Sequence, residues 1–216
     1  MTKTAFSYKF TNVFTSFTLY IMSEKELPKA FKPKEVEDGI YKTWEESGFF
    51  NPDNLKVAPD APAFVISMPP PNVTGQLHMG HALAATLEDI MIRYHRLKQE
   101  RTLWLPGVDH AAIATQNVVE KNLYRQGLRK EDLGQEKFLA RIDEHIKATR
   151  PIIESQIRKV GSSCDWSREA YTLDENLSAA VRHMFVKMYT DGLIYRGYRI
   201  VNWCPKCGST LADDEV

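Results

Sequence analysis

The chain has 216 residues, and its 28 lysine and arginine residues balance 28 aspartate and glutamate residues, so the formal net charge is zero. This balance argues against a protein that binds nucleic acid through a large basic surface, but it does not exclude a local basic patch. Three cysteines, two of them in a C-x-x-C, favour a reducing compartment over a disulfide scaffold. No apolar run approaches the roughly 20 residues of a membrane span, so we expect no membrane partner.

Residues 1–22 are rich in aromatic side chains and contain two lysines and no acid. They lack the arginines of a transit peptide and the continuous apolar core of a secretory signal. Because Met22-Ser23-Glu24-Lys25 resembles an ordinary cytosolic start, we interpret residues 1–22 as a non-native or disordered leader from an upstream start codon. A targeting segment is the alternative. We expect the protein in the cytoplasm.

Residues 23–60 are predicted to be an N-terminal helical segment. Its helix covers residues 33–50, with Val36, Ile40 and Trp44 on one face and Gly48 ending it. Residues 51–62 contain proline and aspartate and form a link.

A strand followed by a helix is predicted next. Residues 63–68 form a short apolar run, which predicts a buried strand, and the prolines at 69–71 end it because proline cannot donate to a ladder. Apolar residues then recur at helical spacing: Leu83, Leu87, Ile90, Met91, Tyr94 and Leu97.

His78 and His81 open this helix and lie on one face of it. Helix N-termini favour anions, and Gly80 lets a ligand approach the backbone. The pattern therefore predicts a nucleotide phosphate site, built without the G-x-x-x-x-G-K-[ST] loop that this chain lacks. The alternative is a pair of surface histidines that only cap a helix.

The remaining elements alternate between strand and helix. We predict a strand over residues 102–105 and helices over 113–124 and 136–160, the second interrupted at Pro151. Thr172 to Glu175 fits a capping box, and the helix after it ends at Gly192. Its inward residues are expected to be Leu177, Val181, Met184, Phe185 and Met188. A last strand covers residues 198–203. This alternation predicts an α/β fold with a Rossmann-like parallel sheet over residues 61–200. The absence of G-x-G-x-x-G disfavours a dinucleotide dehydrogenase.

Residues 69–81 (Pro-Pro-Pro-Asn-Val-Thr-Gly-Gln-Leu-His-Met-Gly-His) resemble the signature region of the class I aminoacyl-tRNA synthetases, and the valine-specific members in particular. Residues 106–116, 165–169 and 201–207 are similar to further blocks of that family in the same order. The resemblance runs from about Leu27 to the last residue. It implies the first half of the class I catalytic domain, followed over residues 201–216 by the start of a zinc-ribbon or editing insertion.

The resemblance also implies an activity, that of a valine–tRNA ligase. The valine carboxylate attacks the α-phosphate of ATP, which carries Mg²⁺, and the valyl group then passes to tRNA(Val). His78 and His81 are the catalytic candidates and form the ATP site together with Gly80. The family's Lys-Met-Ser-Lys-Ser loop is absent from these residues, so this piece alone is expected to be inactive. The alternative is a truncated module that binds nucleotide or tRNA without ligation. The complete protein is expected to be a monomer.

Valine is expected to contact Pro69, Pro70, Asn72 and Asp109. The resemblance implies that Asp109 pairs with the valine ammonium, while rigid prolines suit a small β-branched side chain. One methylene discriminates by only about 1–3 kcal/mol, so the family uses a separate editing domain against threonine. The alternative for Asp109 is the N-cap of the following helix. Val108 and Ala112 depart from the family's usual threonine and glycine.

Cys204 and Cys207 supply two of the four ligands of a tetrahedral zinc site, so they form half a site. His183 is a candidate third ligand, although an ordinary helix position explains it as well. A thioredoxin-like redox role lacks the expected helix after the motif. A zinc-ribbon nucleic-acid binder is disfavoured by the zero net charge. Asp165-Trp166-Ser167-Arg168 is interpreted as structural, with the tryptophan anchoring a packing corner and a charged neighbour tying a loop.

Overall fold

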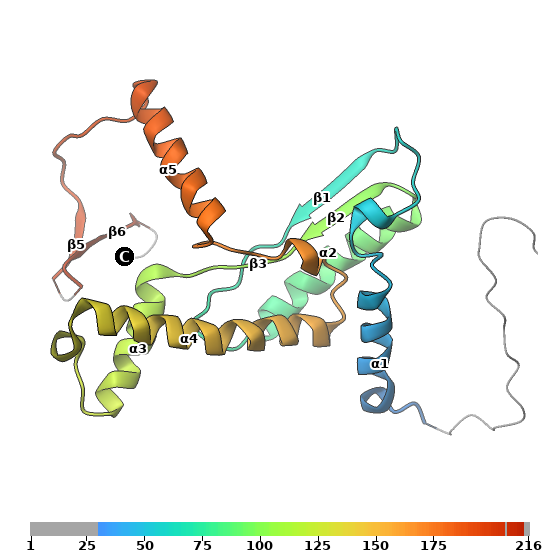
Figure 1. Ribbon diagram of the computed structural model, residues 1–216, viewed down its shortest axis with the longest axis horizontal. Helices are drawn as coiled ribbons and strands as arrows, with labels where there is room; N and C mark the ends of the chain where they lie inside the picture. Colours follow the sequence, from blue (N-terminus) through green and yellow to red (C-terminus); the bar gives the residue numbers. More distant parts are fainter. Residues whose placement is uncertain (1–29, 206, 214–216) are drawn as a thin grey trace, which may run out of the picture. The chain divides into compact units, whose positions relative to one another are not determined.

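The computed structural model describes residues 30–205 and 207–213 (Figure 1). The interpretation of residues 1–22 therefore lies outside the described residues. Helix α1 spans Pro33–Glu46. The chain divides into two compact units, and the second unit, which begins at Glu37, contains all the elements that follow α1. Gly48 has a φ of 72°, a left-handed conformation that ends the helix as predicted. A short 3-10 helix, η1 (Pro52–Asn54), follows.

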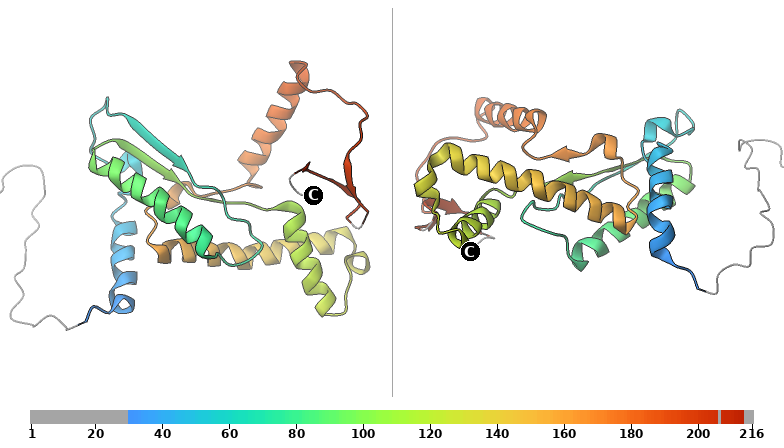
Figure 2. Two further views of the ribbon diagram at one scale, coloured as in Figure 1. Left: turned by 180° about the vertical axis from the view of Figure 1, so that it is seen from behind. Right: turned by 60° about the horizontal axis from the view of Figure 1, so that its bottom comes forward.

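The centre of this unit is a strand–helix–strand arrangement. Strands β1 (Ala63–Ser67) and β2 (Arg101–Leu105) pair in parallel, in a register that sets Ala63 opposite Arg101. Helix α2 (Met79–Leu97) connects them and lies against both (Figures 1 and 2). The predicted parallel sheet is thereby confirmed.

Strand β1 is not buried, which corrects the prediction from its apolar run. Its residues alternate between exposed and half-buried, and Val65 is 58% exposed. The reason is that α2 covers the face of β1 that carries Phe64 and Ile66, whereas no described element packs on the face that carries Val65. An apolar run indicates that both faces of a strand can be buried, but it does not show which other element packs on each face.

A second parallel pair continues from the ends of these strands. Strand β3 (Gly107–Val108) pairs with β4 (Ala170–Tyr171). The N–H of Asp109 donates to the Pro71 carbonyl at 2.8 Å, and the N–H of Val73 donates to the Asp109 carbonyl at 2.9 Å. Proline has no backbone N–H but keeps its carbonyl as an acceptor, so Pro71 can still take part in the hydrogen bonds between the segment after β1 and Asp109.

Helices α3 (Ala112–Arg125) and α4 (Lys130–Val160) pack together through Val119, Leu123 and Phe138 (Figure 2). Helix α4 begins before the predicted residue 136, and the predicted interruption at Pro151 is wrong. The kink lies at Gly134, whose φ of 73° and ψ of 171° are non-helical. Proline's fixed φ fits a helix at the cost of one hydrogen bond, whereas this positive φ suits glycine alone.

The main core lies where α2, the parallel strands and the end of α4 meet. It consists of Met68, Val73, Ile92, Trp104, Val108, Ile153, Ile157, Cys164 and Tyr171. Ile92 is the one fully buried residue of α2. The six apolar residues that predicted this helix are exposed, from 44% for Met91 to 83% for Leu97.

The corner at η2 (Trp166–Arg168) confirms the structural interpretation of residues 165–168. Asp165 is 2% exposed and accepts hydrogen bonds from the Ser167 N–H at 3.1 Å and from Arg168 at 2.7 Å. Trp166 Nε1 donates to the Tyr41 hydroxyl at 2.8 Å, which anchors the corner against α1.

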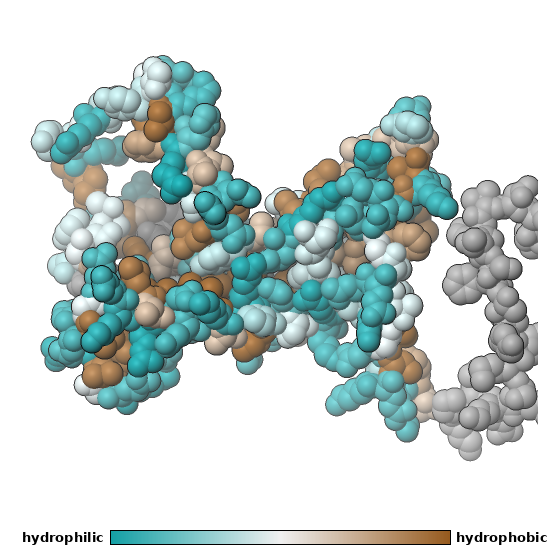
Figure 3. Space-filling view, viewed as in Figure 1, coloured by the Kyte–Doolittle hydropathy of each residue, from teal (hydrophilic) through white to brown (hydrophobic). Residues whose placement is uncertain are grey.

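Helix α5 (Glu175–Thr190) begins and ends near the predicted residues, and Gly192 follows it with a φ of 72°. The predicted capping box is wrong, because Asp174 is the N-cap residue and no side-chain capping bond forms. The predicted inward face is also wrong. Val181 and Phe185 are 68% and 60% exposed, and hydrophobic atoms are visible over α5 in Figure 3.

The chain then forms an antiparallel hairpin of β5 (Asn202–Cys204) and β6 (Ser209–Leu211). The strand predicted over residues 198–203 is therefore limited to its end, and residues 198–201 are irregular. Within the part of the chain that is described, no helix combines the length and the apolarity needed to cross a membrane.

Candidate functional site

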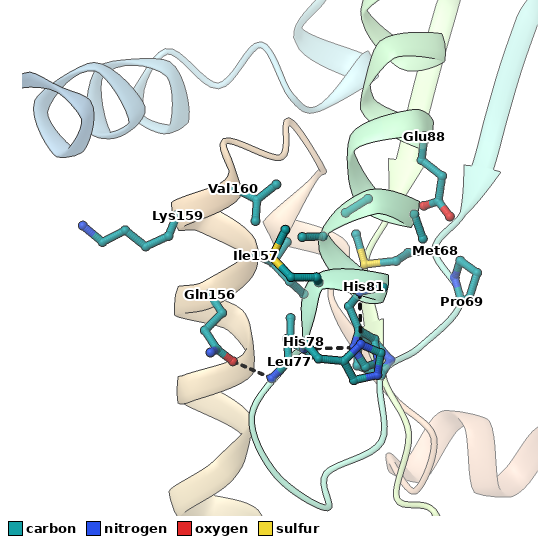
Figure 4. Close-up of a pocket in the computed structure, with 16 residues that line it drawn as sticks. Met68, Pro69, Leu77, His78, His81, Glu88, Gln156, Ile157, Lys159 and Val160 are labelled. Atoms are coloured by element: carbon teal, nitrogen blue, oxygen red, sulfur yellow. Dashed lines mark hydrogen bonds between the residues drawn. The ribbon is translucent and has the colours of Figure 1, made fainter. Parts of the chain in front are cut away.

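The start of α2 is held by its own two histidines. His78 is the N-cap residue, and its Nδ1 accepts a hydrogen bond from the Gly80 N–H at 3.1 Å. Nδ1 of His81, one turn on, accepts from the His78 N–H at 3.2 Å (Figure 4). The two side chains thus form a reciprocal capping box, so the capping interpretation holds as a description of the local structure.

Capping also fixes which ring nitrogens face outward. A backbone N–H can only donate, so both Nδ1 atoms are acceptors and each neutral ring carries its proton on Nε2. Burial, followed by repulsion from His78, lowers the pKa of His81 below its ordinary value and favours this neutral form. Each ring can therefore donate a hydrogen bond to an anion while it caps the helix.

Gly80 is needed at this helix start for the sake of His78. A Cβ atom at position 80 would lie 2.8 Å from Cε1 and 3.0 Å from Nδ1 of the His78 ring. Any side chain there would displace the ring from its capping position.

The predicted ATP and valine residues other than Gly80 line two neighbouring cavities, and Gly80 lines a third. A cavity of about 450 Å³ is bounded by Pro69, Pro70 and Asn72 on one side and by both histidines on the other. A second cavity, of about 570 Å³, contains Asn72 and Asp109. Asn72 borders both cavities and so lies between the histidine end and the aspartate end.

Asp109 does not cap the following helix. The N-cap residue of α3 is Ala111, with a φ of 50° and no side-chain capping bond. The Asp109 carboxylate instead accepts a hydrogen bond from the Thr172 hydroxyl at 2.9 Å. The N-cap alternative is therefore excluded for this structure.

Two side chains of α4 hold the loop that leads to His78, and sequence reasoning missed both. Gln156 Oε1 accepts from the Leu77 N–H at 2.8 Å (Figure 4), and His145 Nε2 donates to the Val73 carbonyl at 2.9 Å. No local pattern could signal them, because each partner lies more than 70 residues away.

An apolar cavity of about 510 Å³ lies between the start of α2 and the end of α4 (Figure 4). Glu88 is a charged residue on its α2 side and accepts from Trp104 Nε1 at 3.0 Å. Burial raises the pKa of Glu88, and the hydrogen bond from Trp104 opposes that rise.

The C-x-x-C motif lies at the turn of the β5–β6 hairpin. The Cys207 N–H donates to Cys204 Sγ at 3.4 Å, so the two cysteines lie close together at this turn. Within residues 30–205 and 207–213, no three His, Cys, Asp or Glu side chains are grouped to hold a metal. His183, the candidate third ligand, is exposed on α5 and belongs to no such group.

A parallel sheet with a helix start beyond the carboxyl end of its first strand is the arrangement in which open α/β domains bind ligands. Residues 39–216 match the family model described as tRNA synthetases class I (I, L, M and V), and the chain belongs to this family.

The particular relatives are valine–tRNA ligases. The chain is 52% identical over 199 residues to the valine–tRNA ligase of Treponema denticola, covering 90% of this chain and 22% of that protein. It is 53% identical over 190 residues to that of Carboxydothermus hydrogenoformans, covering 88% and 21%. The chain therefore spans about a fifth of the length of the curated relatives it matches.

A solved structure agrees on the fold. The LeuRS of a LeuRS–tRNA–LeuAMS ternary complex from Agrobacterium radiobacter matches with a TM-score of 0.70 and 19% identity. The match covers 87% of this chain and 22% of that one. The resemblance to class I synthetases, including its valine-specific members, is thus confirmed.

Proposed function

We propose that this chain is the N-terminal part of a valine–tRNA ligase and carries its ATP-binding and valine-binding residues. The complete protein would form valyl-adenylate from valine and ATP with Mg²⁺, and would transfer the valyl group to tRNA(Val). The observation that carries the proposal is the capped start of α2, where two neutral imidazoles keep their Nε2 protons for a ligand. The identity to valine–tRNA ligases supports it.

The chemistry assigned to this site is positioning and charge stabilisation. Nε2–H donors of His78 and His81, together with the positive end of the helix dipole, would stabilise charge that develops on the phosphates. The valine carboxylate is itself the nucleophile, so no covalent enzyme intermediate is needed. Mg²⁺ would carry part of the phosphate charge.

Asp109 would bind the valine ammonium, and Pro69, Pro70 and Asn72 would enclose the side chain. The cavity shared by Asn72 and Asp109 supports this assignment, as does the 32% exposure of the Asp109 carboxylate. A wall of prolines changes shape little and so disfavours a larger side chain. Rejection of threonine would fall to an editing domain in the complete protein.

Zinc binding by Cys204 and Cys207 is a further part of the proposal. Two thiolates on a hairpin turn suit half of a tetrahedral site, and the other ligands would come from outside the described residues. On the same family basis we propose that the complete protein is a monomer located in the cytoplasm. We also propose that the chain divides into residues 1–22, 23–60, 61–200 and 201–216.

The test is valine-dependent exchange between ATP and pyrophosphate, measured on the protein expressed from its complete reading frame. Replacing His78 or His81 by alanine should slow adenylate formation by about 10²–10³-fold and change valine affinity little. Equal losses in the rate of adenylate formation and in the affinity for valine would contradict a transition-state role. Nucleotide binding without exchange in the unmodified protein would favour the alternative, a binding module without ligase activity.

A further inference from the structure

The hydroxyl of Thr172 lies at the centre of a small polar network beside Asp109. Its Oγ1 is 2.9 Å from Asp109 Oδ1, 2.9 Å from the His110 backbone nitrogen and 2.6 Å from His110 Nδ1. Thr172 follows β4 directly, and Asp109 follows β3.

The register of the two strands brings these residues together. Gly107 pairs with Ala170 and Val108 with Tyr171, and the Thr172 N–H donates to the Val108 carbonyl at 3.2 Å. The next pair along this ladder is therefore Asp109 and Thr172. Residues directly opposite each other in a sheet place their side chains on the same face.

Hydrogen-bond accounting fixes the role of each atom. A carboxylate can only accept, so the single proton of the Thr172 hydroxyl goes to Asp109. The two lone pairs of Oγ1 are then left for His110, which donates through both its backbone N–H and its Nδ1–H. Every donor and acceptor of this hydroxyl is satisfied, so its direction toward Asp109 is fixed.

The other carboxylate oxygen stays available. Among the described residues, no protein donor contacts Asp109 Oδ2, whereas Oδ1 receives the Thr172 hydroxyl and lies 3.3 Å from His110 Nδ1. The backbone of Asp109 is held from both sides by Pro71 and Val73. A neutral hydroxyl orients the carboxylate without neutralising it, so negative charge remains on the carboxylate for a cationic ligand.

We propose that Thr172 is a positioning residue that orients the Asp109 carboxylate toward the substrate ammonium and so sets the affinity for the amino acid. The inference rests on the proposed function, in which Asp109 binds that ammonium. Thr172 touches neither valine nor ATP in this role and acts only through Asp109.

Thr172→Val tests this role because it keeps the shape of the side chain and removes the hydroxyl. Valine-dependent ATP–pyrophosphate exchange is measured on the protein from the complete reading frame. We expect the KM for valine to rise about 10- to 100-fold, while kcat and the KM for ATP change little. Thr172→Ser restores the hydroxyl and should recover most of the affinity. Thr190→Val, which alters an exposed hydroxyl on α5, serves as the matched control.

Asp109→Asn is measured in parallel to separate the two hypotheses. An increased KM for valine in Asp109→Asn with no change in Thr172→Val would overturn the role of Thr172 and leave the proposed function intact. No change in either variant would overturn the ammonium assignment itself. Equal increases in the KM for valine in Thr172→Val and Thr172→Ser, accompanied by lower melting temperatures, would mean that Thr172 has only a structural role.

Should Thr172→Val not fold, it is replaced by Thr172→Cys, whose S–H is a weak donor and should give an intermediate KM for valine.

Discussion

The backbone N–H of His78 donates to Nδ1 of His81 at 3.2 Å, so the second histidine of the signature caps the helix that the first one opens. Under the proposed function, stability and ligand binding would therefore be combined in one side chain, through different ring nitrogens. The two roles can be separated, because glutamate is a natural capping-box residue at this helix position.

His81→Glu should keep the capping bond and the stability of the protein. His81→Ala should lower the free energy of unfolding by about 1 kcal/mol. Both should abolish most valine-dependent exchange, and the glutamate variant should lose more because its charge repels phosphate. Urea unfolding and the exchange assay measure the two effects. Equal destabilisation by alanine and glutamate would show that His81 contributes nothing as a cap.

Glu88→Gln should stabilise the protein near neutral pH. Burial raises the pKa of Glu88 in the folded state. The contribution of this carboxyl to folding stability is therefore fully present below its unfolded pKa and is lost as pH rises through its folded pKa. Glutamine stays neutral and keeps an acceptor for Trp104. The stability advantage of the variant should thus be larger at about pH 7 than at about pH 4. An advantage independent of pH would rule out titration of Glu88 as its cause.

Gln156→Leu should loosen the loop before His78. The Leu77 N–H loses its acceptor, and its amide should exchange with solvent roughly five- to tenfold faster, equivalent to about 1 kcal/mol. Hydrogen exchange read by NMR or mass spectrometry measures this rate. Gln156→Glu keeps the acceptor and is the control. Similar rates in both variants and the unmodified protein would mean that Gln156 does not hold the loop.

Asp165→Ala should destabilise the protein by about 3 kcal/mol, because it removes a buried carboxylate that ties Ser167 and Arg168. Ser167→Ala removes one hydroxyl from the same corner and should cost only about 1 kcal/mol. Denaturant unfolding compares the two. The structural role of Asp165 is refuted if both substitutions cost the same small amount.

Zinc content tests the hairpin. The protein from the complete reading frame, purified with zinc present, should hold about one equivalent, and Cys204→Ser or Cys207→Ser should lower it strongly. Cys164→Ala is the control, since Cys164 is buried in the main core and distant from the hairpin in the chain. Unchanged zinc in the hairpin variants would remove these cysteines as ligands.

Local patterns predicted the elements that local forces determine. The parallel pairing of β1 and β2 follows from strand–helix alternation, and α2 follows from apolar spacing. The position of His78 and His81 at the helix start was predicted for the same reason. Gly134 was overlooked as the kink of α4, since proline is the stronger signal in a sequence although its φ suits a helix.

Side-chain contacts between distant segments could not be predicted this way. The Thr172–Glu175 spacing matches a capping box, but the hydroxyl is taken by Asp109 from 63 residues away. Likewise, the apolar spacing of α5 identifies a face without showing what covers it, and Phe185 is 60% exposed. For the candidate site, the residue types were predictable, whereas Gln156, His145 and Thr172 depend on tertiary contacts.

The capped helix start also bears on how a nucleotide could be selected. Because both Nδ1 atoms accept hydrogen bonds from the backbone, protonating either atom would break a cap, so a ring that caps the helix is an uncharged donor. Uncharged donors recognise where oxygen atoms are placed and add little to the long-range attraction of a polyanion. Such a helix start would select a phosphate chain by its shape more than by its charge.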